Sequence, residues 1–215
     1  TDKAADPSNV MGCTKLLAEK MMLATHFYKG HKRTKFCFVR FGNVLGSRGS
    51  VVPLFLQQAK RGGPLTITDP EMTLFFMSIP GAVNLIFKAA SIMQNREIFI
   101  LKMPVASMGD VAGAVVEMVK ESSGLSHDIA IKIVGRKDGE RPHEKLLTRE
   151  ESENALETDD MFIIIPHSSL KSDDFGAHSP PVSFYPNAKT ASLGEYSSKG
   201  LPKLTVSEIK RMLTD

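Results

Sequence analysis

The order in which helical and strand-like patterns follow one another constrains the fold of this chain most. An amphipathic helix is predicted over residues 8–29, and an apolar strand over residues 36–41 comes next. A second helix, residues 51–61, follows a glycine-rich loop. Strands and helices then keep alternating, over residues 65–68, 80–91, 97–101, 109–120 and 129–134. This alternation predicts an α/β fold and argues against a helical bundle or a β-sandwich.

Helix signals support the first and last of these elements. Pro7 suits the start of the first helix, Ser8 or Asn9 can cap it, and Gly30 supplies a left-handed stop. A capping box, Thr205 with Glu208, opens a last short helix through residue 213. The first helix repeats apolar residues along one face, namely Val10, Leu17, Met21 and Ala24. Two apolar groups, Met21-Met22 and Phe75-Phe76-Met77, are predicted to lie in the core.

Composition narrows the class of protein. The chain has 215 residues, with 27 lysines and arginines against 24 aspartates and glutamates, and 42% of its residues are hydrophobic. That suits a globular core, and a net charge of +3 is too weak to predict nucleic-acid binding. Two cysteines, Cys13 and Cys37, fit a reducing compartment better than a secreted, disulfide-bonded protein. Since no apolar run is long enough to span a membrane and Thr1 begins no leader pattern, we expect a cytoplasmic protein.

The glycine-rich loop, residues 42–50, has a physical use of its own. A strand that feeds a glycine-rich turn into a helix N-terminus exposes backbone N–H groups and a positive dipole end, which together attract anions. The loop lacks Gly-Lys-Ser/Thr, so it is not a nucleoside-triphosphate P-loop.

The chain also lacks features that a complete dinucleotide-binding fold needs. It opens into a helix, and no Gly-x-Gly-x-x-Gly follows an opening strand. We therefore expect the C-terminal part of a larger α/β protein, without the N-terminal nucleotide-binding strands. Its predicted parts are residues 1–50, a remnant of a Rossmann-type domain; residues 51–165, a substrate-binding α/β region; and residues 166–215, an extended arm with a C-terminal helix.

Several segments together resemble one enzyme family. They are Thr1-Asp2-Lys3-Ala4 with Asn9-Val10-Met11-Gly12-Cys13-Thr14-Lys15, then residues 42–53, Ile67-Thr68-Asp69-Pro70-x-Met72-Thr73, Gly139-Glu140 with His143-Glu144, and the closing helix. The pattern resembles nucleotide-sugar 4,6-dehydratases of the extended short-chain dehydrogenase superfamily, which act on UDP-N-acetylglucosamine in polysaccharide biosynthesis. The resemblance covers nearly the whole chain.

The resemblance implies a catalytic segment of Thr1, Asp2, Lys3, Met11 and Lys15. Met11 occupies the place where the superfamily has the tyrosine of a Tyr-x-x-x-Lys pair, and a thioether cannot exchange a proton. Asp2 is then the candidate base for oxidation at sugar carbon-4. For the elimination that follows, Lys3 would take the carbon-5 proton and a protonated Asp2 would protonate the departing hydroxyl. Neighbours in extended backbone point to opposite sides, so we expect Asp2 and Lys3 to diverge.

The resemblance also implies binding residues. Lys15 and Phe41 would contact a cofactor, NAD or NADP, which we expect this chain alone to bind poorly. A UDP-sugar would contact Asn43, Arg48, Val51, Val52, Pro53, Thr66, Thr68, Lys137 and Glu140. Two positions depart from the family pattern, since Leu74 and Lys137 stand where the family usually has arginine. Losing these two guanidinium groups, which can bind a phosphate through two hydrogen bonds, should weaken diphosphate binding.

Three functions stay open on these grounds. The first is dehydration of a UDP-amino sugar to a 4-keto-6-deoxy sugar, with the isolated chain inactive. The second is nucleotide-sugar 4-epimerisation, and the third is a non-catalytic nucleotide-sugar-binding or interaction remnant. We expect a homo-oligomer and a possible separate chain that carries the nucleotide-binding part. The six histidines show no metal-ligand spacing, so no metal site is predicted.

Overall fold

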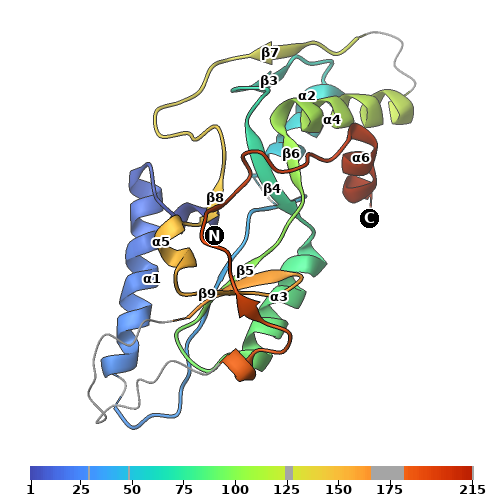
Figure 1. The fold of residues 1–215 in the computed structure, drawn as a ribbon. Coiled ribbons are helices and arrows are strands. Elements are labelled where there is room, and N and C mark those ends of the chain that lie inside the picture. The colour runs from blue at the N-terminus through green and yellow to red at the C-terminus, as the bar shows by residue number, and fades with distance from the viewer. Residues whose placement is uncertain (29, 48, 124–127, 166–181, 215) are drawn as a thin grey trace. The chain divides into compact units, whose positions relative to one another are not determined.

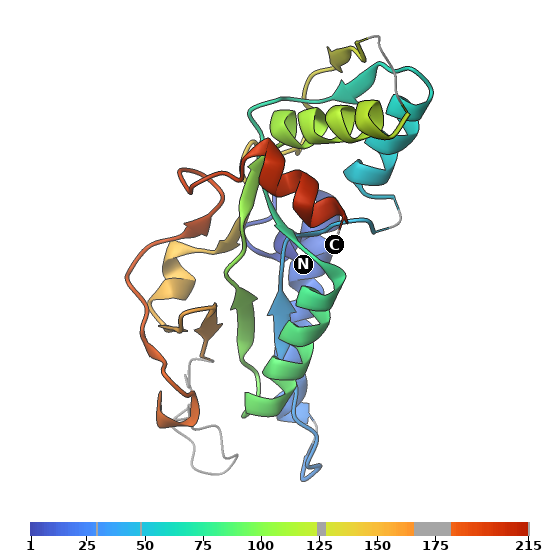
Figure 2. The ribbon, with the colours of Figure 1, turned by 90° about the vertical axis from the view of Figure 1, so that its right-hand side faces the viewer.

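The computed structural model describes the chain except for residues 29, 48, 124–127, 166–181 and 215. It divides into two compact units, and each is described separately below (Figures 1 and 2). Unit 1 comprises Thr1–Phe41, Val83–Lys102 and Lys145–Tyr196, and unit 2 comprises Gly42–Ala82, Met103–Glu144 and Ser197–Asp215.

Unit 1 is built on a mixed sheet of strands in the order β1-β5-β10-β9-β11. The strands are β1 (Phe38–Arg40), β5 (Ile98–Leu101), β10 (Met161–Ile164), β9 (Ala155–Glu157) and β11 (Lys189–Thr190). β1 runs parallel to β5, and the remaining pairs are antiparallel. The register aligns Val39, Phe99 and Ile163 in one row across the sheet. Leu85 and Ala89 of helix α3 (Ile79–Ile92) join the core formed there.

The other elements of unit 1 are short, apart from α1. A 3-10 turn, η1 (Asp2–Ala4), precedes α1 (Val10–Tyr28). Asn9 caps α1, because its Oδ1 accepts the Gly12 N–H at 2.9 Å. The remaining elements are β8 (Lys145–Leu147), α5 (Arg149–Ser152), η3 (Val182–Phe184) and β12 (Tyr196–Ser197), with β12 paired to β8.

Unit 2 packs three helices on short strands. β2 (Asn43–Val44) lies parallel to β4 (Thr73–Met77), β4 is antiparallel to β6 (Val105–Ser107), and β3 (Leu65–Ile67) is parallel to β7 (Ile131–Ile133). The helices are α2 (Val51–Lys60), α4 (Met108–Ser123) and α6 (Val206–Thr214), which Figure 2 shows gathered together. Their apolar faces meet β4 in one core, through Phe55, Val115, Ile209 and Phe76.

The predicted α/β class and the predicted helices are confirmed. The capping box of α6 also forms, since the Thr205 N–H donates to the Glu208 carboxylate at 2.8 Å and the Glu208 N–H donates to Thr205 Oγ1 at 3.3 Å. Phe75, Phe76 and Met77 lie in the core as predicted. The prediction for Met21 and Met22 is wrong, because both are exposed. Their helix buries its opposite side, which carries Gly12 and Glu19.

Arg40, the last residue of β1, connects α1, β1 and α5 in the interior of unit 1. Its side chain is 1% exposed, and all five of its N–H hydrogens are used. Nε and Nη2 bond the Glu19 carboxylate at 2.9 and 2.6 Å, while Nη1 and Nη2 bond that of Glu151 at 2.8 and 2.7 Å. The last hydrogen goes to the Leu146 carbonyl at 3.0 Å.

This arrangement keeps both partners charged. Burial disfavours the carboxylate form of Glu151, but the hydrogen bonds and the charge of Arg40 outweigh it and hold the pKa of Glu151 below its usual value. Burial likewise opposes the charged guanidinium, yet the two glutamates raise the pKa of Arg40 above its usual value.

We predict that Arg40→Met lowers the free energy of unfolding by about 3–5 kcal/mol, because it leaves two uncompensated carboxylates in the interior. Urea unfolding monitored by circular dichroism measures the loss. Arg149→Met is the matched control, since Arg149 is exposed on α5. Adding Glu19→Gln and Glu151→Gln to Arg40→Met should recover part of the stability, as no charge then stays buried. Equal unfolding midpoints for Arg40→Met and Arg149→Met would contradict this account.

Candidate active site

The segment predicted to be catalytic begins unit 1 as a tight turn. Thr1 caps η1, its Oγ1 accepting the Lys3 N–H at 3.3 Å. The Lys3 ammonium contacts both carboxylate oxygens of Asp2 at 3.1 Å. The side chain of Asp2 is 13% exposed and that of Lys3 is 40% exposed. The expectation of extended backbone with diverging side chains is therefore wrong, because the 3-10 turn brings the two opposite charges to the same side.

Gly12 lets this turn approach α1 closely. A Cβ at position 12 would lie 2.8 Å from the Lys3 carbonyl oxygen and 2.8 Å from Pro7 Cβ, so only a glycine fits. Met11 and Lys15 flank Gly12 on α1, and both are exposed. The structure thus brings the η1 backbone against the first turns of α1, where the other catalytic candidates lie. Phe41, directly after β1, packs against the core of unit 1.

Asn43, on β2, is held by unit 2 itself. Its Nδ2 donates to Glu144 Oε1 at 2.8 Å and to the Phe75 carbonyl at 3.2 Å. Glu144 Oε2 accepts the Phe75 N–H at 2.9 Å. Asn43 therefore lies beside Glu144.

The loop predicted to bind an anion leads into the start of α2. Gly46 and Gly49 have positive φ angles of 72° and 78°, which bend the loop into the helix. Ser50 takes the N-cap position, but its side chain makes no capping bond. Its Oγ is buried and has no hydrogen-bond partner among the described residues. Arg48 lies outside the described residues.

The other predicted binding residues are already engaged, at least in part. Val52 is buried in the core, whereas Val51 and Pro53 are half-buried. Thr66 bonds Gln58 of α2 through its backbone N–H and its hydroxyl, and the Thr68 hydroxyl donates to Met72 Sδ at 3.2 Å. Glu140 Oε2 accepts the backbone N–H of Lys137 at 2.9 Å, which closes a local turn. Leu74, at a departure from the family pattern, is a core residue.

Sequence reasoning left four residues of this region without a role. Thr73 Oγ1 contacts His143 Nδ1 and Ser198 Oγ, both at 2.8 Å, and Ser198 Oγ also accepts the Glu144 N–H at 2.9 Å. Ser198 is fully buried. The motif containing His143 and Glu144 was visible in the sequence, but their partners lie tens of residues away, and no local pattern could have indicated them.

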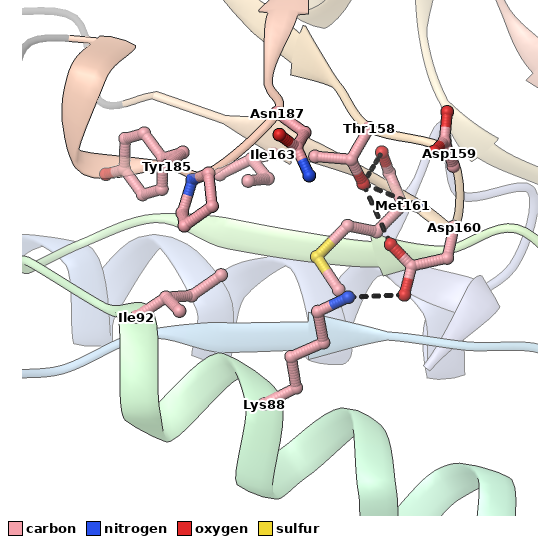
Figure 3. A pocket seen from close by; sticks show the side chains of 10 residues that line it. Lys88, Ile92, Thr158, Asp159, Asp160, Met161, Ile163, Tyr185 and Asn187 are labelled. Atoms are coloured by element: carbon pink, nitrogen blue, oxygen red, sulfur yellow. Dashed lines mark hydrogen bonds and ion pairs between the residues drawn. The ribbon is translucent and has the colours of Figure 1, made fainter.

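Unit 1 contains a cavity of about 320 Å³. Figure 3 shows Lys88 extending from α3 toward Asp160, with which it pairs at 2.5 Å. The Thr158 hydroxyl donates to the other Asp160 oxygen at 2.9 Å. The cavity lining includes none of the residues predicted to bind substrate or cofactor.

Among the residues that the structure describes, no group of three histidine, cysteine, aspartate or glutamate side chains is placed to hold a metal ion. No described helix is both long and apolar enough to cross a lipid bilayer.

The model of one protein family, described as "Polysaccharide biosynthesis protein", matches residues 1–166. The chain belongs to this polysaccharide biosynthesis protein family.

Three relatives agree with that assignment. An uncharacterized membrane protein of Methanocaldococcus jannaschii is 49% identical over 78% of this chain and 50% of its own length. Capsular polysaccharide biosynthesis protein CapD of Staphylococcus aureus is 46% identical over 70% of this chain and 24% of its own length. UDP-glucose 4-epimerase of Rickettsia canadensis is 33% identical over 99% of this chain and 59% of its own length.

A solved structure confirms the fold of this polysaccharide biosynthesis protein. The crystal structure of Pen from Bacillus thuringiensis matches with a TM-score of 0.84 and 38% identity, over 99% of this chain and 59% of that one. The fold is that of the nucleotide-sugar epimerases and dehydratases of the extended short-chain dehydrogenase superfamily, across part of their length. The chain spans between a quarter and three fifths of the length of the relatives it matches.

The close approach at Gly12 yields a test in this family member. We predict that Gly12→Ala lowers the free energy of unfolding by about 1–3 kcal/mol, because the added methyl group must displace η1 from α1. Gly194→Ala is the control, since its Cβ would meet no atom within 4 Å and its φ is not positive. Urea unfolding compares the two. A Gly12→Ala protein as stable as the wild type would place η1 away from α1.

Proposed function

We propose that this chain carries the active-site segment and the substrate-binding part of a cytoplasmic UDP-hexosamine 4,6-dehydratase in polysaccharide biosynthesis. One observation carries the proposal. An amine and a carboxylate, Lys3 and Asp2, lie 3.1 Å apart in a turn that touches α1 between Met11 and Lys15. An acid and a base side by side are what elimination of water from a hexose requires.

The elimination would use these two side chains together. Once carbon-4 is a ketone, the Lys3 amine takes the proton from carbon-5, and the electron pair forms the double bond to carbon-6. The carbon-6 hydroxyl leaves as water with a proton from the Asp2 carboxyl group. This step starts from a neutral Lys3 amine, formed when its ammonium group loses a proton to solvent, and from the Asp2 carboxyl group, which holds the proton taken from the carbon-4 hydroxyl during oxidation. It ends with the charged pair that the structure contains.

Oxidation at carbon-4 needs a base and a hydride acceptor. The exposed thioether of Met11 holds no exchangeable proton, so Asp2 is the proposed base. The exposed ammonium of Lys15 on α1 suits a nicotinamide ribose, and the backbone of Phe41 lies at the end of β1. A bound NAD or NADP would supply the hydride acceptor at carbon-4 and the hydride donor at carbon-6. The fold that binds it would come from outside these 215 residues, in the same polypeptide or in a separate chain.

The UDP-sugar would lie on unit 2. The first N–H groups of α2 have no partner within the helix, and the Ser50 hydroxyl has none among the described residues, which supports a diphosphate site there. The exposed Lys137 supplies a cation. Since Leu74 is a core residue, no guanidinium from that position reaches the ligand. We propose Asn43, Val51, Pro53 and Thr66 as further substrate contacts.

Nucleotide-sugar 4-epimerisation is the second candidate. It is favoured by relatives named UDP-glucose 4-epimerase that are 33–34% identical over 99% of this chain. The products separate the two reactions, because only dehydration yields a 4-keto-6-deoxy sugar.

We predict that the full protein, given NAD and UDP-N-acetylglucosamine, forms a 4-keto-6-deoxy product detectable by mass spectrometry as a loss of one water. Lys3→Met should lower kcat by about 10²–10⁴-fold, because it removes the base. Met11→Leu should stay close to wild type, because position 11 carries no proton. Lys32→Met, at an exposed position, controls for the loss of a lysine. Exclusive formation of the 4-epimer would overturn the dehydratase proposal.

The apolar stripe on α1 supports a homo-oligomer. Val10, Leu17, Met21 and Tyr28 recur along one face, opposite the buried Glu19, and are 80%, 59%, 62% and 86% exposed. A face of this kind on a soluble protein marks an interaction surface, and we propose that a second copy covers it.

We predict that Leu17→Lys shifts the protein toward the monomer, because it places a charge in the centre of this stripe. Sedimentation velocity at several concentrations measures the change. Glu153→Lys, at an exposed position off α1, should leave the assembly unchanged. A wild-type protein that sediments as a monomer at all concentrations would exclude the proposed contact.

A further inference from the structure

One edge of β4 is completed by side chains. Toward β6, the strand makes an antiparallel ladder. On its other edge, β2 pairs only with Phe76 and Met77. At Phe75 the partners are side chains, with the N–H donating to Glu144 Oε2 at 2.9 Å and the carbonyl accepting from Asn43 Nδ2 at 3.2 Å. Since buried backbone groups must be paired, Asn43 and Glu144 replace a neighbouring strand at this point.

These contacts fix which way the Asn43 amide points. The oxygen and nitrogen of an amide have nearly the same shape, so chemistry must assign them. Both neighbours of the Nδ2 atom, a carboxylate oxygen and a backbone carbonyl, can only accept hydrogen bonds. The end that faces them is therefore the NH2 group, and its two hydrogens are both used. Among the described residues no partner is recorded for Asn43 Oδ1, so this acceptor is the polar atom available to a ligand.

Glu144, which sets this orientation, is itself held in place. Its backbone N–H donates to Ser198 Oγ at 2.9 Å, and its carbonyl accepts the Ser198 N–H at 2.9 Å and the Ser197 hydroxyl at 3.0 Å. Ser198 Oγ also donates to the Thr73 carbonyl at 2.8 Å, on the same edge of β4. The backbone of Glu144 is thus anchored through both its N–H and its carbonyl group.

Resting on the proposed function, we infer that Asn43 accepts a hydrogen bond from a hydroxyl of the sugar, and that Glu144 is the positioning residue that fixes this polarity. A phosphate oxygen carries no hydrogen to offer to Oδ1 and would be repelled by it. The diphosphate would then lie at the start of α2, where the N–H groups of Val51 and Val52 have no partner within the helix, and Asn43 would contact the sugar.

Glu144→Gln tests the polarity because it reverses it. The glutamine Oε1 can still accept the Phe75 N–H, but its NH2 group then faces the NH2 group of Asn43. Rotating the Asn43 amide by half a turn relieves this contact, gives up the hydrogen bond to the Phe75 carbonyl and turns Nδ2 toward the ligand. The variant should then donate a hydrogen bond where the wild type accepts one.

The binding experiment uses the full protein with UDP-N-acetylglucosamine and with analogues in which one sugar hydroxyl at a time is replaced by fluorine. Fluorine cannot donate a hydrogen bond. For one analogue, calorimetry should show binding to the wild type weaker by about tenfold or more, because Oδ1 then loses its donor. In Glu144→Gln, the ratio of the affinities for UDP-N-acetylglucosamine and for this analogue should fall to within about threefold. Glu71→Gln removes the same charge from a side chain that is 82% exposed, and should keep the wild-type ratio.

A second readout needs no ligand. In the 15N-labelled protein, the side-chain amide hydrogens of Asn43 should be protected from exchange, and Glu144→Gln should remove the protection. Unprotected hydrogens in the wild type would overturn the assigned polarity. Protected hydrogens with equal binding of all fluorinated analogues would overturn the sugar contact alone. Protected hydrogens with no binding of any UDP-sugar would remove the ligand assignment together with the proposed function, and leave the polarity standing.

Discussion

The interior of unit 1 depends on a single cation. Arg40 uses every hydrogen of its guanidinium on α1, α5 and the carbonyl of Leu146, so three elements from distant parts of the sequence share one set of directional bonds. Such a group is costly to bury and more costly to leave half-paired, which makes its geometry strict. Because α1 is fixed to β1 through Glu19, and η1 rests on α1 at Gly12, the positions of Asp2 and Lys3 follow from this cation.

In unit 2, the backbone groups on one edge of β4 need hydrogen-bond partners. On the edge of β4 that pairs with β2, a bridge from the segment around His143 supplies a backbone partner at Thr73, and side chains of Asn43, Glu144 and Ser198 supply further hydrogen bonds in place of a continuous ladder. A strand partner would tolerate substitution, since its backbone makes the bonds. Side-chain partners do not, because each bond belongs to one residue type. The residues that close this edge are also the ones nearest the proposed sugar contact, so stability and ligand recognition rest on the same atoms.

Helices were the part of the fold that sequence reasoning predicted well. Their periodicity and caps are local, as the capping box of α6 and the Asn9 cap of α1 illustrate. Strand β4 was missed because all five of its residues are buried, which removes the alternation that marks a strand. The choice of buried face on α1 also escaped prediction, since apolar Met21 faces outward and charged Glu19 inward. Glu19 is buried only because Arg40, 21 residues later, pairs with it.

The contacts around Asn43 also determine when the proposed sugar contact can form. Asn43 meets Glu144 across 101 residues of sequence, and Thr73 meets Ser198 across 125. Loops of that size close late, after local helices have formed. During synthesis, residues 43 and 73 leave the ribosome long before their partners do. These contacts around the proposed sugar site therefore require that the chain has been made past residue 198.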